Sequence, residues 1–122
     1  MQNKQAIQII EKIQKEIHLN KFQIDTAVAD LKKVRELTME EQNPVLTKAL
    51  RLAYEHLDQN EAFLIEIPND DLFEGDLESD FEPYSKENNL ESFNYFLSLL
   101  LNFTKKNNLL DLKEYNKALI AF

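Results

Sequence analysis

The chain has 122 residues, of which 43% are hydrophobic and 30% charged, with a formal net charge of −8 and no cysteine. This composition is typical of one folded domain and excludes disulfides, thiolate metal sites and cysteine nucleophiles. The lack of cysteine, of an apolar signal core and of a membrane-length apolar run predicts a cytoplasmic protein. One glycine and three prolines are few chain breakers, which favours helices. We expect a single all-α domain over 1–122, a small bundle of four to five helices with one long acidic loop over about 68–88.

Apolar residues in the first third of the chain recur at alternating steps of four and three, which is the period of one helix face. Asn20 is the only polar member of that face. One interpretation is a single helix of about 38 residues, which would be nearly 60 Å long. The favoured interpretation is two helices, over 3–18 and 21–38, because Asn20 can cap the second helix with Gln23 at its third position.

A further helix is predicted over 44–59. Thr38 begins a sequence that matches a capping box, and Asn43 places a capping residue directly before a proline. The short apolar run over 62–67 suits either a buried strand or a continuation of this helix. The apolar spacing of the helix continues into the run, which favours the helical alternative.

The acidic residues are unevenly distributed. The window 52–85 holds 11 of the 22 Asp and Glu residues and no Lys or Arg, whereas the rest of the chain has 11 acids against 14 basic residues. Over 74–82 the acids take the even positions, and Phe73, Leu77 and Phe81 fall on odd ones. This alternation is typical of an extended segment with one polar face, although the same apolar residues also fit a helical stripe. We expect a loop whose apolar side chains contact the bundle while its carboxylates face water.

The last third of the chain is again helical in pattern. Residues 90–107 are apolar nearly all round the helix, which indicates either a central buried helix or an oligomer contact. Lys105 and Lys106 suit the C-terminal end of this helix electrostatically. A final helix is predicted over 110–121.

The residues offer little catalytic or metal-binding chemistry. His18 is expected at a helix end and His56 on a solvated or interface surface, and neither is expected to act as a base. If Gly75 took the sixth position of a calcium loop, Leu72 and Phe81 would stand where oxygen ligands are required. The sequence also lacks the helical di-metal motif and a Gly-rich phosphate loop. We therefore expect no catalytic residue, no cofactor and no metal site.

The function favoured by these patterns is non-enzymatic protein binding by an adaptor, an immunity or antitoxin-like protein, or a chaperone. In this hypothesis an acidic face engages a basic protein partner, since acidic patches speed association with basic surfaces. The predicted partner-binding residues are Asp70, Asp71, Phe73, Glu74, Asp76, Leu77, Glu78, Asp80, Phe81 and Glu82.

Two other functions are weighed against this one. The first is a self-assembling protein that forms a homodimer through the 90–103 helix. The second is a small-ligand-binding bundle with a cavity lined by Phe93 and Phe96. Nucleic-acid binding is not expected, because phosphate neutralisation dominates such affinity and the chain is acidic overall. Membrane binding is not expected either.

Overall fold

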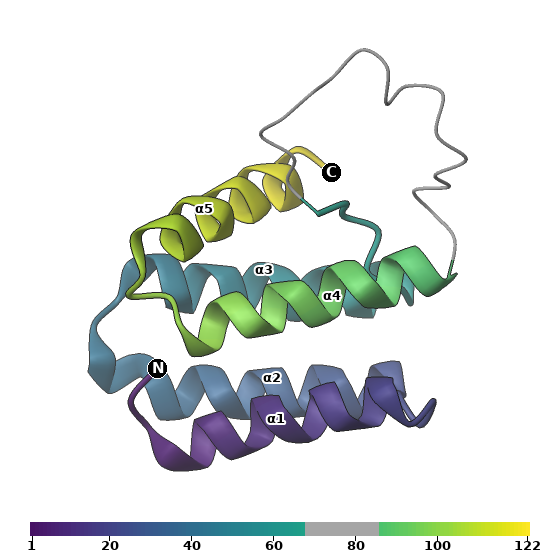
Figure 1. Cartoon of the computed structure of the whole chain (residues 1–122), viewed down its shortest axis with the longest axis horizontal. Coiled ribbons are helices and arrows are strands. Elements are labelled where there is room, and N and C mark those ends of the chain that lie inside the picture. The colour runs from purple at the N-terminus through teal and green to yellow at the C-terminus, as the bar shows by residue number, and fades with distance from the viewer. Residues whose placement is uncertain (68–85) are drawn as a thin grey trace.

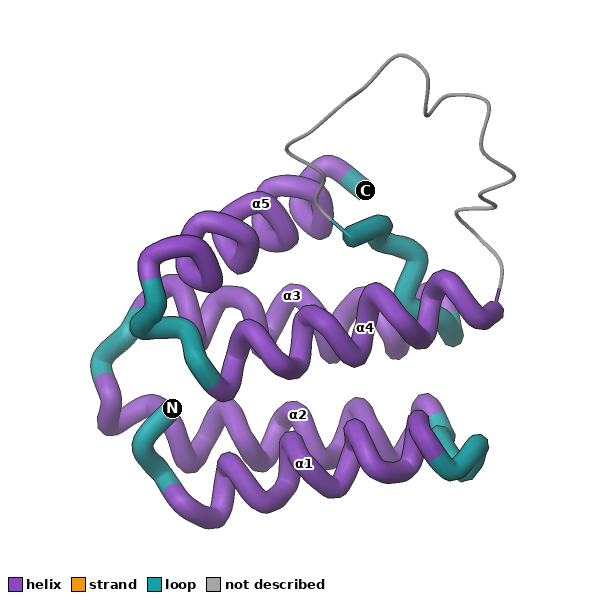
Figure 2. Tube along the Cα trace, viewed as in Figure 1, coloured by secondary structure: helices purple, strands orange, loops and turns teal. Residues whose placement is uncertain are grey.

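The computed structural model describes residues 1–67 and 86–122, which form five α-helices, one short 3-10 helix and no strand. The helices are α1 (Lys4–His18), α2 (Ile24–Thr38), α3 (Pro44–Asn60), α4 (Lys86–Leu101) and α5 (Lys106–Ala121), with the 3-10 helix η1 (Met39–Glu41) between α2 and α3. The predicted all-α bundle is therefore confirmed (Figures 1 and 2). The predicted acidic loop lies outside the described residues as far as residue 85, after which α4 begins.

The helices pack as a ring in which α1 contacts α2 and α4, α3 contacts α2 and α5, and α4 contacts α5. Figure 1 shows α1 and α2 in the lowest layer, α3 and α4 in the middle and α5 above them. The five helices have 15 to 17 residues each, so each is roughly 22–26 Å long. Because they are similar in length and alternate in direction, α1 and α3 end at the same end of the bundle at which α2 and α4 begin.

The centre of the core is formed largely by α4. Phe93, Phe96, Leu97 and Leu100 on this helix have 0% exposed surface. The ring of Phe96 meets that of Tyr115 on α5 edge-on, with 5.2 Å between the centroids. The apolar residues of this helix predicted either a central buried helix or an oligomer contact. In the structure they are covered by other helices of the same chain.

The break between α1 and α2 confirms two helices, but the expected role of Asn20 is wrong. Asn20 has φ of 58° and ends α1 instead of capping α2. Its N–H donates to the Ile17 carbonyl (3.2 Å), and the Lys21 N–H donates to the Glu16 carbonyl (2.8 Å). This pair of bonds is the Schellman motif, which an asparagine can form because it tolerates left-handed backbone. Gln23 is instead the residue before α2, and its side chain makes no capping bond.

The two capping predictions near α3 have opposite outcomes. Asn43 caps α3 as predicted, since its Oδ1 accepts from the Leu46 N–H at 3.0 Å and a proline follows it. The capping box at Thr38 is wrong. Thr38 is the buried last residue of α2, and its hydroxyl donates back to the Val34 carbonyl at 2.9 Å.

The predicted continuation of α3 over 62–67 is also wrong. Glu61 has φ of 55°, and its N–H donates to the Leu57 carbonyl at 2.9 Å. This left-handed residue turns the chain away from the helix axis, so the 61–67 segment that follows is neither helix nor strand.

The chain also reverses earlier than predicted between the last two helices. The Asn102 carbonyl accepts from the Lys105 N–H (3.2 Å) and from the Asn108 side-chain amide (3.0 Å). α4 therefore ends at Leu101, and Lys105 precedes α5 instead of closing a helix that runs to 107.

Candidate functional site

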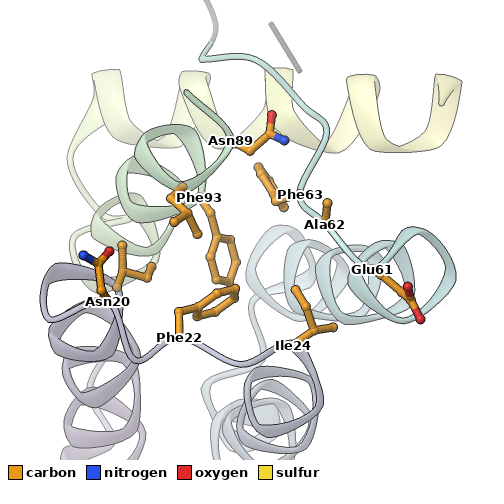
Figure 3. Close-up of a pocket in the computed structure, with 10 residues that line it drawn as sticks. Asn20, Phe22, Ile24, Glu61, Ala62, Phe63, Asn89 and Phe93 are labelled. Atoms are coloured by element: carbon orange, nitrogen blue, oxygen red, sulfur yellow. The ribbon is translucent and has the colours of Figure 1, made fainter. Parts of the chain in front are cut away.

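A cleft of about 360 Å³ opens at the end of the bundle where α1 and α3 end and α4 begins. Its lining residues are Ile17, Asn20, Phe22, Ile24, Glu61, Ala62, Phe63, Asn89, Leu90 and Phe93. The volume lies near the lower limit of small-ligand sites, which hold about 300–1,000 Å³. Figure 3 shows this site with its surrounding helices.

Three aromatic side chains form the apolar wall of the cleft. The ring centroids of Phe22 and Phe93 are 5.5 Å apart, and those of Phe63 and Phe93 are 5.0 Å apart. These separations are typical of attractive tilted aromatic pairs. The carboxylate of Glu61 points away from the rings (Figure 3), whereas Asn20 and Asn89 add amide groups to the lining.

Left-handed backbone flanks the cleft on two sides. Asn20 and Glu61 both line it, and both have positive φ although neither is glycine. A left-handed residue is common at the C-terminal end of a helix, where asparagine tolerates this backbone better than glutamate does. The two residues end α1 and α3 and direct the following chain, with Phe22 in one case and Phe63 in the other, across the end of the bundle.

His56 holds the 61–67 segment against α3. Its Nε2 accepts a hydrogen bond from the Leu64 N–H at 2.9 Å, and its ring lies edge-on to Phe63 and to Phe122. Because a backbone N–H can only donate, Nε2 must be unprotonated, and the neutral ring carries its proton on Nδ1.

The prediction that His56 is solvated or at an interface is therefore wrong. The residue is 5% exposed, and burial lowers its pKa from the ordinary value of 6.5. The chain after Glu61 folds back over this face of α3, and periodicity within α3 cannot reveal such a contact. His18, by contrast, is exposed in the last turn of α1, as expected.

A second hydrogen-bond network ties the 61–67 segment to α4 and α5. The Ser92 hydroxyl donates to the Ile65 carbonyl at 2.6 Å. Since this uses its only proton, the Tyr115 hydroxyl must donate in turn to Ser92, whose Oγ and carbonyl oxygen lie 2.9 and 3.1 Å away. Burial raises the pKa of Tyr115, which keeps this hydroxyl in its donating form. The cleft wall is thus fixed from two sides.

A smaller hollow of about 270 Å³ adjoins the cleft and shares Ile17 and Leu90 with it. Its remaining lining residues are polar or charged: Gln14, His18, Glu91 and Asn94. We call this the polar hollow. The end of the bundle therefore offers an apolar cleft next to a region of hydrogen-bonding side chains.

The residues predicted to bind a partner, from Asp70 to Glu82, lie outside the described residues. The acidic stretch that contains them leaves the described chain after Ile67 and rejoins it at Lys86, near the cleft-lining residues in sequence. Of the two residues predicted to line a cavity, Phe93 lines the cleft and Phe96 does not.

Sequence reasoning missed Phe22 and Phe63. Both lie just beyond a helix end, away from the apolar stripes. The similar lengths of the predicted helices were the available signal. Helices of similar length that alternate in direction bring their ends, and the residues just beyond them, together.

Within 1–67 and 86–122, no group of three or more His, Asp and Glu side chains is placed to hold a metal ion. In the same residues, no helix combines the length and the apolar character needed to cross a membrane. No protein-family model matches the chain, and comparison with curated proteins and with solved structures found no match.

Proposed function

We propose that this protein is a non-enzymatic binding module that engages a basic protein partner. The observation that carries the proposal is the position of the cleft. It opens at the end of the bundle at which the acidic stretch joins the described chain. A carboxylate-rich stretch that follows the cleft-lining Phe63 and precedes the cleft-lining Asn89 in the sequence suits a partner that combines Lys and Arg with apolar side chains.

The charge of the described residues at this end supports the same partner class. The exposed acids here are Asp25, Asp58, Glu61 and Glu91, and the exposed cations are Lys15 in the last turn of α1 and Lys21 in the α1–α2 turn. The window 52–85 adds no Lys or Arg. A negative surface of this kind raises the association rate with cations and repels acidic proteins.

The test compares two triple variants that change the net charge equally. One replaces Glu74, Glu78 and Glu82 by Gln in the acidic stretch. The control replaces Glu11, Glu36 and Glu40 by Gln on exposed surfaces elsewhere. The immobilised wild type and the control should capture the same basic proteins, and added salt should weaken this capture. The variant changed in the acidic stretch should no longer capture them. Equal capture by all three proteins would contradict the proposal.

A small-ligand-binding protein is the second candidate, and the cleft is the observation that favours it. A neutral aromatic compound would contact Phe22, Phe63 and Phe93. In a thermal-shift screen, such a compound should raise the Tm of the wild type but not that of Ala62→Trp, in which the larger side chain fills the cleft. A screen of aromatic metabolites with no such response removes this candidate.

A further inference from the structure

We propose that the cleft and the polar hollow form one groove that binds an extended peptide segment of the partner, with a large apolar side chain of that segment seated in the cleft. This inference rests on the proposed function, to which it adds the binding site and the mode of recognition.

The cleft has the size and chemistry for one large apolar side chain. Its volume of about 360 Å³ is lined on one side by the rings of Phe22, Phe63 and Phe93. The carboxylate of Glu61 points away from these rings (Figure 3), so a charged group seated among them would lose its hydration without gaining a carboxylate partner there. A buried aromatic or branched aliphatic anchor loses no such partner, and side chains of this kind dominate the affinity of many interfaces.

The polar hollow distinguishes a peptide from a compact apolar ligand. A peptide main chain has a donor and an acceptor at almost every residue, and these need partners when they leave water. The hollow supplies such partners through Glu91, Asn94 and the side-chain carbonyl of Gln14, whose Nε2 already donates to the Asn94 carbonyl and the Ser98 hydroxyl. It continues from the cleft across Ile17 and Leu90. A ligand confined to the cleft would not use this extension.

Charge complementarity selects a basic segment. Glu61 lines the cleft, and Glu91 lines the hollow together with His18. Lys or Arg residues that flank the apolar anchor would therefore approach carboxylates, each exposed pair adding modestly to affinity but strongly to the choice of partner.

The test uses defined peptides and two matched variants. The probes are three capped five-residue peptides: phenylalanine between lysine pairs, alanine between lysine pairs, and phenylalanine between glutamate pairs. Ala62→Trp fills the cleft, and the control Ala118→Trp changes a partly buried alanine on α5. Amide chemical shifts are followed by NMR during titration, and Tm confirms that both variants are folded.

The lysine–phenylalanine peptide should bind at least about tenfold more tightly than the lysine–alanine peptide, a difference of about 1.4 kcal/mol. Its binding should shift the amides of Phe63, Leu90 and Glu91 together. The preference for phenylalanine should vanish in Ala62→Trp and persist in Ala118→Trp.

Other results separate the two proposals. Equal affinity for the two lysine peptides, unchanged binding in Ala62→Trp, or no binding of the lysine–phenylalanine peptide overturns the groove. Tight binding of both phenylalanine peptides supports the groove and overturns a basic partner. A wild-type dimer that Ala62→Trp converts to monomer overturns the peptide proposal, because a second copy would then occupy the cleft.

Discussion

The centre of the bundle and its cleft end are stabilised by partly different interactions. At the centre, α4 buries Phe96, Leu97 and Leu100 completely among apolar neighbours. At the cleft end, the 61–67 segment buries Phe63 and Ile65 in the same core, and polar groups also bind its main chain. His56 accepts from the Leu64 N–H, and Ser92 donates to the Ile65 carbonyl. Buried apolar area therefore stabilises both regions, and at the cleft end specific hydrogen-bond partners of the main chain also determine the shape of the site.

The largest effect is expected from a cavity at the centre. Leu97→Ala should lower the free energy of unfolding by about 2–5 kcal/mol, because a fully buried side chain is removed from a packed core. Chemical denaturation followed by circular dichroism measures the loss. Leu110→Ala, at a leucine that is 51% exposed on α5, is the control and should change stability by no more than about 0.5 kcal/mol. If Leu97→Ala instead dissociated an oligomer without loss of stability, the centre would be an interface.

Removing one hydrogen bond to the 61–67 segment should lower stability by a smaller amount, with the effect concentrated at the cleft end. Ser92→Ala deletes the hydroxyl bound to the Ile65 carbonyl and should cost about 1–3 kcal/mol, because a buried acceptor loses its donor. Ser98→Ala is a control on the same helix, where the hydroxyl donates to the Asn94 carbonyl and accepts from Gln14 Nε2 in a more exposed position. Equal losses of stability in the two variants would show that the hydrogen bond from Ser92 to Ile65 contributes no more than the exposed bonds of Ser98.

Glycine at a left-handed position should be slightly stabilising. Glu61→Gly relieves the cost of φ at 55° and should raise the free energy of unfolding by about 0.5–1 kcal/mol, net of the greater entropy of the unfolded chain. Glu66→Gly, at an exposed residue of the same segment whose φ is not positive, should instead be destabilising. A loss of stability in both variants would contradict the claim that Glu61 is strained.

The smallest expected effect is a dependence of stability on pH. The pKa of His56 is lowered by burial, so the unfolded chain takes up a proton at a higher pH than the folded protein. The contribution of His56 to the free energy of unfolding is therefore constant above about pH 6.5. It declines as the pH falls from there toward the lowered pKa of the folded protein.

Unfolding free energies at about pH 7.5 and pH 5.5 would measure this decline. The drop should be smaller in His56→Gln than in the wild type. It should persist in His18→Gln, since His18 lies exposed on α1. An equal drop in wild type and His56→Gln would show that other groups cause it.

Much of the fold followed from local sequence patterns. The helical class, the break near Asn20 and the Asn43 cap depend on periodicity and on side chains that bond to nearby backbone. The end of α3 was missed because apolar spacing continues beyond Glu61 although the backbone turns there. Periodicity describes which face is apolar, but it carries no information on a single left-handed residue.

The candidate site could be predicted only in part. Phe93 belonged to a recognisable apolar helix, whereas Phe22 and Phe63 reach the cleft from outside the helices. Their meeting point depends on how chain ends pack together, which no local window contains. His56 was misplaced for the same reason, because its burial depends on residues such as Phe63 and Phe122 that lie elsewhere in the chain.

The bond from the Leu64 N–H to the His56 ring also provides a local reporter. This amide is protected by a side chain and not by a helix, so its hydrogen exchange measures the opening of the 61–67 segment. Amides in the middle of α4 should exchange only through global unfolding. The difference between the two opening free energies would give the fraction of molecules in which the cleft wall is detached while the bundle remains folded.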